Sequence, residues 1–194
     1  METQRHEANR EKQRVALLSV ASNTILVIGK LLVGFAIGSV SVISEAIHSA
    51  VDLVAAVIAL FAVRSSARPA DRDHPFGHGK VENLSGTLEA LLIFGAAAWI
   101  LFEAVGKLRS NEPLEAPLWG VVVMGISSLA NWQVSRRLFA VGKAHDSPAL
   151  VADAWHLRTD VYTSLGVMAG LAIVTVGSWL FPAYDLHWID PLAA

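Results

Sequence analysis

Hydrophobic residues in this chain are gathered into five long segments, which short polar connections separate. Each segment is long enough to cross a hydrocarbon layer of ~30 Å as a helix, which takes about 20 residues. The pattern therefore predicts an all-α membrane protein, a helical bundle with five spans. Those spans are expected at residues 15–37, 40–63, 83–106, 117–135 and 149–180.

Composition supports a chain embedded in a lipid bilayer. The 194 residues are 54% hydrophobic and 16% charged, whereas about 25% of residues are charged in typical soluble domains. The net charge of −2 includes no basic excess, so we expect no nucleic-acid partner. Because the chain has no cysteine, a metal site would have to be built from nitrogen and oxygen ligands.

The distribution of lysine and arginine predicts the orientation in the membrane. The polar N-terminal tail (1–14), the 64–80 loop and the 136–148 connection together hold eleven of the fifteen basic residues. Basic connections stay in the cytosol, so the N-terminus is expected there. The apolar run after the tail exceeds a signal-peptide core, and we expect it to be retained as the first span.

The C-terminal residues suggest a span that is begun and not finished. Residues 186–194 read "LHWIDPLAA", like the opening of a sixth apolar segment. We therefore expect residues 15–194 to form a transmembrane domain with five spans of a six-span transporter fold. On this interpretation the chain is a fragment.

A ten-residue pattern occurs twice, 108 positions apart. "SEAIHSAVDL" (44–53) and "ADAWHLRTDV" (152–161) both carry an acid, then His48 or His156, then Asp52 or Asp160 four residues later. The second span would run inward and the fifth outward, so the repeat is inverted, as in many transporters. Each His–Asp pair lies about 8–12 residues into its span, or ~12–18 Å deep, close to the midplane.

This repeat has the chemistry of a metal site. Residues four apart share a helix face, so two opposed helices would offer two imidazole nitrogens and two carboxylate oxygens. Zn²⁺ accepts such a tetrahedral shell, and two carboxylates neutralise a divalent ion in lipid. The alternative is a buried hydrogen-bonded pair on each helix. Two inverted copies at equal depth favour the metal site over that alternative.

Other polar residues within the spans have more than one possible role. Glu45 and Asp153 precede the two histidines by three positions, and they either orient the histidines or face a water cavity. Lys30 is expected to extend toward the outer interface. Glu89 and Asn23 are expected to face either the bundle interior or a water cavity.

The 64–80 loop holds a second group of metal-ligating residue types. "ADRDHPFGHGKVE" contains Asp71, His74 and His78 among a proline and two glycines, so a regular helix is not expected there. The residues either serve solubility alone or bind a second ion.

Several ordered motifs resemble the cation diffusion facilitator family, the proton-coupled zinc exporters. They are "GSVSVISEAIHSAVD", "FGHGKVE" and "SPALVADAWHLRTDV". Members have six spans followed by a cytosolic ferredoxin-like domain, which this chain lacks, and they work as homodimers. The resemblance implies a transport site at His48, Asp52, His156 and Asp160, and a loop site at Asp71, His74 and His78.

These features predict proton-coupled efflux of divalent cations by a multi-pass protein of a prokaryotic inner membrane. Zn²⁺ is the expected ion, with Fe²⁺, Co²⁺, Cd²⁺ and Ni²⁺ as further candidates, and no prosthetic cofactor is expected. One alternative is a metal-sensing or assembly protein that binds the ion without moving it. A metal-dependent hydrolase is disfavoured, because four protein ligands leave no open position on the metal.

Overall fold

The computed structural model describes residues 2–37, 40–110 and 118–180, and these residues form five helices and no strands. The all-α prediction is therefore confirmed for the described part of the chain. The expected start of a sixth span, 186–194, lies outside the described residues. The helices are α1 (Glu2–Ile37), α2 (Val40–Ser66), α3 (Lys80–Ser110), α4 (Leu118–Ala144) and α5 (Pro148–Leu180).

Two helices extend well beyond the apolar segments that the sequence marks. α1 runs back through the polar tail to Glu2, and α4 continues to Ala144 through most of the expected 136–148 connection. The α1 extension is rich in Glu, Arg and Gln, and the α4 extension is rich in Arg and Ala; all of these are strong helix formers. Polarity indicates where a helix leaves the lipid and does not indicate where the helix ends.

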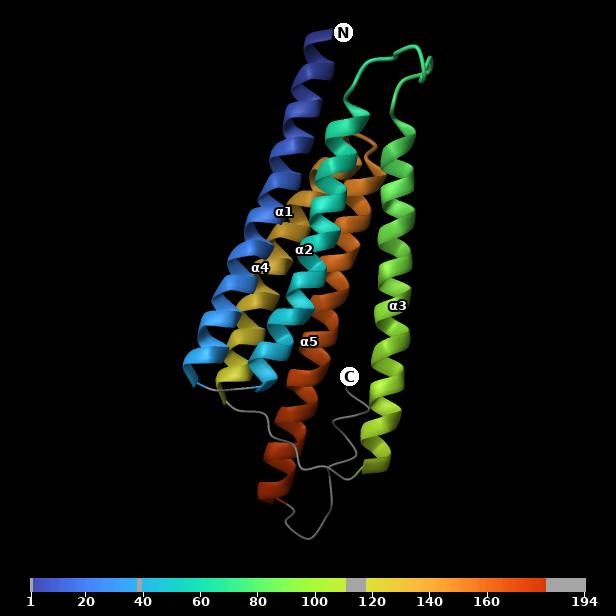
Figure 1. Ribbon diagram of the computed structural model, residues 1–194. Coiled ribbons are helices and arrows are strands. Elements are labelled where there is room, and N and C mark those ends of the chain that lie inside the picture. Colours follow the sequence, from blue (N-terminus) through green and yellow to red (C-terminus); the bar gives the residue numbers. More distant parts are fainter. Residues whose placement is uncertain (1, 38–39, 111–117, 181–194) are drawn as a thin grey trace.

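The helices form a bundle in which α1 lies beside α2 and α4 beside α5, while α3 packs on the flank of α5 and α2 (Figure 1). α2 and α5 run in opposite directions, as the inverted repeat predicts. The start of α1, the α2–α3 connection and the α4–α5 turn all lie at one end of the bundle. We call this end the loop end.

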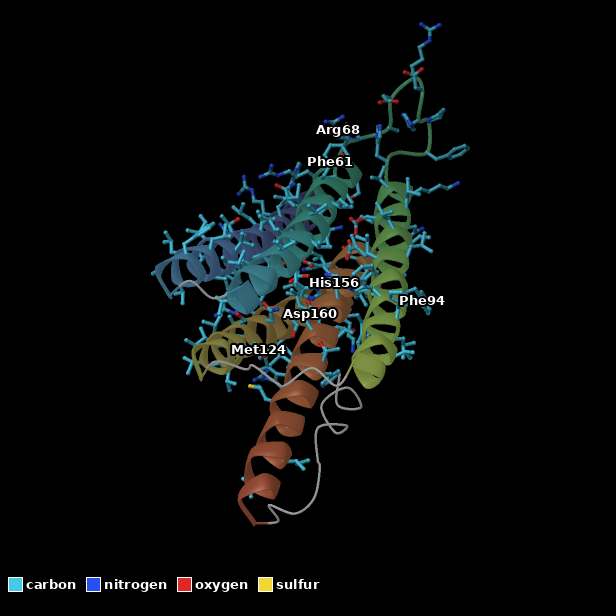
Figure 2. The ribbon with its side chains drawn as sticks, turned by 60° about the horizontal axis from the view of Figure 1, so that its bottom comes forward. Phe61, Arg68, Phe94, Met124, His156 and Asp160 are labelled. Carbon is cyan, nitrogen blue, oxygen red and sulfur yellow. The ribbon has the colours of Figure 1, made fainter. Side chains whose placement is uncertain are left out.

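Large apolar side chains cover the outside of the bundle. Phe35, Phe61 and Phe94 are each at least 65% exposed, and Figure 2 shows Phe61 and Phe94 pointing away from the other helices. Small residues such as Ala55 and Ala59 fill the contacts between helices. A surface of this kind is stable in lipid and costly in water.

Segments of α1 and α2 have the length and hydropathy of membrane spans. Among the described residues these are His6–Ala36 and Ala46–Ser66, which contain 18-residue windows of mean hydropathy 1.9 and 2.2. Together with the apolar outer surface, they identify a membrane protein.

A tight turn fixes where α5 begins. Asp146 adopts a left-handed conformation (φ 46°) after the end of α4, and the Ser147 amide donates to the Gly142 carbonyl at 2.8 Å. Pro148 then opens α5, a position where its fixed φ suits a helix. The turn therefore sets the axial position of the His–Asp motif on α5.

Candidate metal centre

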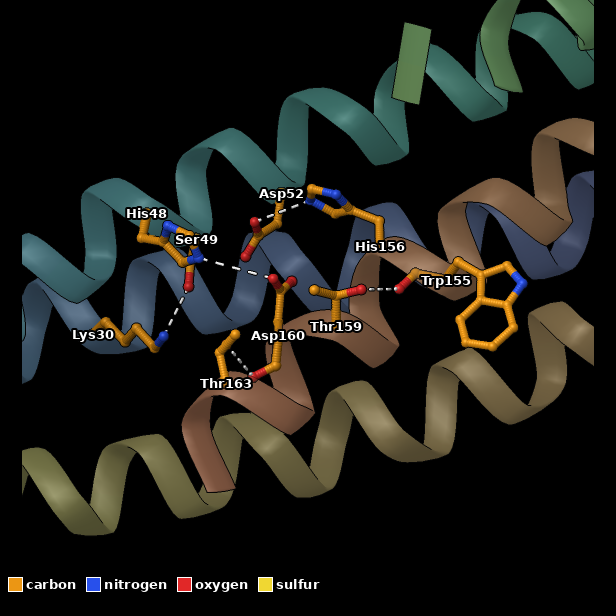
Figure 3. Close-up of polar contacts among 9 residues, drawn as sticks. All are labelled: Lys30, His48, Ser49, Asp52, Trp155, His156, Thr159, Asp160 and Thr163. Carbon is orange, nitrogen blue, oxygen red and sulfur yellow. Dashed lines mark hydrogen bonds and ion pairs between the residues drawn. The ribbon is translucent and has the colours of Figure 1, made fainter. Parts of the chain in front are cut away.

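The four residues of the repeat come together between α2 and α5. His156 Nε2 lies 3.2 Å from Asp52 Oδ1, and His48 Nε2 lies 3.9 Å from Asp160 Oδ1 (Figure 3). Each histidine thus pairs with the aspartate of the other helix. We call these four residues the His–Asp site.

Burial and spacing suit the His–Asp site to a cation. Asp52 and His156 are 3% and 5% exposed, and Asp160 Oδ2 is buried without a hydrogen-bond partner among the described residues. One ligand atom each from His48, Asp52 and Asp160 fits within a 4.8 Å group. The contact between His156 and Asp52 brings the fourth ligand beside the same group. Three ligand atoms therefore lie within reach of one ion, and His156 is outside this group but in contact with one of its members.

A cavity of about 290 Å³ opens on one side of the His–Asp site. His48, His156 and Asp160 line it from α2 and α5, and Thr159 and Thr163 add hydroxyls. The opposite wall is apolar and belongs to α3, which contributes Ile93, Ala96, Ala97 and Leu101. A hydrated ion can occupy such a space next to its ligands.

Lys30 does not extend to an interface, so that expectation is wrong. Its side chain is 5% exposed, and its ammonium group donates to Ser49 Oγ at 2.8 Å (Figure 3). Ser49 directly follows His48 on α2, so a buried positive charge lies close to the His–Asp site. The sequence could not indicate this, because the direction of Lys30 depends on which helix packs against α1.

Between α2 and α3, Asp71, His74 and His78 form a second cluster. Asp71 lies 3.4 Å from His74 Nδ1 and 3.3 Å from His78 Nε2, and one ligand atom of each residue fits within a 4.8 Å group. The two imidazole rings are 4.4 Å apart. We call this cluster the loop site.

Backbone geometry holds the loop site in shape. The amides of Asp73 and His74 donate to Asp71 Oδ1 at 3.1 and 2.7 Å, and Gly77 adopts a φ of 82°. The hydrogen bond from the His74 amide lowers the pKa of the Asp71 carboxyl below its ordinary value, and the charge of His78 adds to this effect. Asp71 is therefore an ionised ligand at neutral pH.

Sequence reasoning missed a buried ion pair at the loop end. Lys12 of α1 donates to Glu82 Oε1 at 2.5 Å, and Ser66 of α2 donates to the same oxygen. Ser147, just before α5, donates to Glu82 Oε2. The carboxylate of Glu82 on α3 thus binds α1, α2 and the turn before α5 at the loop end.

Three further polar residues within the helices have an assigned place in the structure. Glu89 and Asn23 are 0% and 1% exposed, so they face the bundle interior and not a water cavity. Asp153 is also fully buried. The side chain of Glu45 lies outside the described residues.

Comparison with known proteins agrees with this architecture. Residues 16–194 match the profile of the cation efflux transmembrane domain. The chain belongs to the cation diffusion facilitator family. This membership confirms the family resemblance that the motifs predict.

Individual relatives within the cation diffusion facilitator family are named as transporters or efflux proteins. An uncharacterized transporter of Synechocystis is 39% identical over 92% of this chain and 56% of its own length. The cation-efflux pump FieF of Cronobacter sakazakii is 34% identical over 97% and 60% of the two chains. The manganese efflux system protein MneP of Bacillus subtilis is 31% identical over 92% of this chain and 61% of its own length. The chain thus spans about three fifths of the length of these relatives.

Proposed function

We propose that this chain forms the membrane-spanning part of an exporter that moves Zn²⁺ out of the cytosol in exchange for protons. The observation that carries the proposal is the crosswise pairing of His48 with Asp160 and of His156 with Asp52. In this proposal, two oppositely directed helices each contribute one nitrogen and one oxygen to an N2O2 ligand set. Family membership supports cation efflux as the kind of reaction.

The ligand set favours Zn²⁺ over harder ions. Imidazole suits Zn²⁺, whereas Mn²⁺ prefers carboxylate, carbonyl and water oxygens. The relative named as a manganese efflux protein makes Mn²⁺ the informative competitor. Fe²⁺, Co²⁺, Cd²⁺ and Ni²⁺ are further substrates to compare.

Proton exchange follows from the chemistry of the ligands. A histidine or carboxylate must lose its proton before it binds a metal, and histidine ordinarily titrates at ~6.5. Protons that enter from outside would displace Zn²⁺ from the His–Asp site. Rocking of the helices would then return the protonated site to the cytosolic side, where the loop site collects the next ion.

The loop end of the bundle faces the cytosol in this proposal. It contains the start of α1, the α2–α3 connection and the end of α4 (Figure 1), and eleven of the fifteen basic residues lie in residues 1–14, 64–80 and 136–148. A homodimer in the inner membrane of a prokaryote is the proposed working form.

Flux measurements in liposomes test this function. The purified protein should carry Zn²⁺ into the liposome lumen faster than Mn²⁺, and protons should leave the lumen in exchange, so that the lumen becomes more alkaline. His48→Ala should abolish Zn²⁺ flux, while His6→Ala, at an exposed position in the N-terminal tail, should leave it unchanged. Zn²⁺ binding without flux would favour the sensing or assembly role, and flux without proton movement would exclude antiport.

A further inference from the structure

Polar residues line the facing sides of α3 and α5 between the loop end and the His–Asp site. On α3, Glu82, Ser85 and Glu89 recur at spacings of three and four, which places them on one helix face. All three are at most 4% exposed. On α5, Asp153 precedes His156 by three residues, or ~4.5 Å along the axis toward the loop end.

A close helix contact brings Glu89 and Asp153 together. A Cβ atom added at Gly86 would lie 3.4 Å from the Pro148 carbonyl oxygen and 3.7 Å from Ala152 Cβ. Glu89 is three residues beyond Gly86, and Asp153 follows Ala152. Both carboxylates therefore lie next to the contact between α3 and α5.

These carboxylates are buried with most of their oxygens unsatisfied. Both residues are 0% exposed. Ser85 donates to Glu89 Oε1 at 3.0 Å, but Glu89 Oε2 and both Asp153 oxygens have no hydrogen-bond partner in the described part of the chain. Ser19 of α1, also fully buried, lies beside Asp153 without completing a hydrogen bond. Buried carboxylates are normally hydrogen-bonded, paired or bound to a cation.

We propose that Glu89 and Asp153 form a further binding site for a divalent metal cation, one helical turn from His156 toward the loop end. The oxygens that lack partners supply the ligands, and two carboxylates balance the charge of one such ion. An all-oxygen site binds Zn²⁺ less tightly than a site with two imidazoles. Its place on the route from the cytosol to the His–Asp site rests on the proposed transport function, whereas binding itself does not.

Equilibrium binding of Zn²⁺ to the purified protein in detergent tests this site. Asp160→Asn and His78→Ala first weaken the two other sites. In that background we expect one weakly bound Zn²⁺ per chain, and Glu89→Gln or Asp153→Asn should raise its Kd by at least about tenfold. Glu11→Gln is the matched control, since it removes one exposed carboxylate on α1, and it should leave the Kd unchanged.

Thermal melting separates a ligand role from a structural one. Without metal, Glu89→Gln and Asp153→Asn should melt no lower than the parent, because each replaces a buried carboxyl group with a neutral amide of similar shape. These measurements use the same background, in which Asp160→Asn and His78→Ala weaken the other two sites. There, Zn²⁺ should raise the melting temperature of the protein with Glu89 and Asp153 intact, and not that of either variant. If the weak binding and the Zn²⁺-induced shift survive both substitutions, the two carboxylates carry protons only and the proposal is wrong.

The further site and the transport function can fail separately. Loss of Zn²⁺ flux in His48→Ala tests transport, whereas the Kd and melting measurements require no flux. Glu89→Asp keeps the carboxylate and should retain Zn²⁺ binding, which guards against a loss caused by misfolding alone.

Discussion

His156 and Asp52 lie 3.2 Å apart between Nε2 and Oδ1, although 104 residues separate them in the chain. His48 and Asp160 repeat the relationship in the reverse sense at 3.9 Å. Both contacts join α2 to α5. The His–Asp site therefore depends equally on two helices that run in opposite directions.

Asp52→Asn should weaken Zn²⁺ binding at the His–Asp site by about a hundredfold or more. The change removes one anionic ligand and also the carboxylate beside His156, and losing even an orienting partner of a metal ligand costs about 10–100-fold. Isothermal titration of the purified protein in a His78→Ala background measures this loss directly.

Asp146→Asn is the control for that experiment. It removes the same charge in the α4–α5 turn, and asparagine tolerates the left-handed backbone conformation at this position. Zn²⁺ affinity should not change. Equal affinities for Asp52→Asn and the parent would show that the ion binds elsewhere.

Lys30→Met should tighten Zn²⁺ binding at the His–Asp site. The Lys30 ammonium contacts Ser49, the neighbour of His48, and repels a cation there. Charges of +1 and +2 that lie ~10 Å apart interact by about 3 kcal/mol at an effective dielectric constant of about 20, so a decrease of at least about tenfold in Kd is expected. Competition with a chelator of known affinity measures it. Lys30→Arg keeps the positive charge and should leave the Kd unchanged. An unchanged Kd in Lys30→Met would contradict this electrostatic role.

The loop site should lose Zn²⁺ between about pH 7 and pH 5. Acidification protonates histidine ligands, and a protonated imidazole cannot bind a metal ion. Asp71 remains ionised throughout this range, because hydrogen bonding lowers the pKa of its carboxyl below an ordinary value that is already near 3.8. Zn²⁺ binding in an Asp160→Asn background, measured across this pH range, tests the prediction.

Substitutions at the loop site distinguish the ligands. His78→Ala should abolish the pH-dependent Zn²⁺ binding there, since His78 Nε2 faces Asp71. Asp71→Asn should weaken binding and keep the turn, because an amide oxygen can still accept from the His74 amide. Binding that persists unchanged in both variants would show that this cluster serves solubility alone.

Lys12→Met should lower the stability of the bundle by about 3 kcal/mol. The substitution leaves the Glu82 carboxylate buried with only the Ser66 and Ser147 hydroxyls, and an uncompensated buried charge is costly. Unfolding in mixed micelles with increasing dodecyl sulfate measures the change.

The double variant Lys12→Met/Glu82→Gln separates the ion pair from general packing. It removes both charges and should recover most of the lost stability. Destabilisation that simply adds for the two substitutions would show that the pair is not coupled.

Periodicity explains why much of this architecture was predictable. A helix spacing of four puts His48 with Asp52 and His156 with Asp160, and inverted copies must face each other if their helices are neighbours. The positions of Lys30 and Glu82 were not predictable, because each side chain meets a helix distant in sequence. The start of α1 and the end of α4 were also not predictable, since polar residues at the loop end continue both helices beyond the apolar segments.

Crosswise pairing also bears on how this protein can be altered. Because each histidine is held by the acid of the other repeat, neither copy of the motif is a self-contained module. A substitution in one copy leaves its partner in the other copy mismatched, so a change of metal preference has to be engineered in both halves together. Because of the inverted repeat, the effect of a substitution in one segment depends on the residues of the other, which lies 108 positions away in the chain.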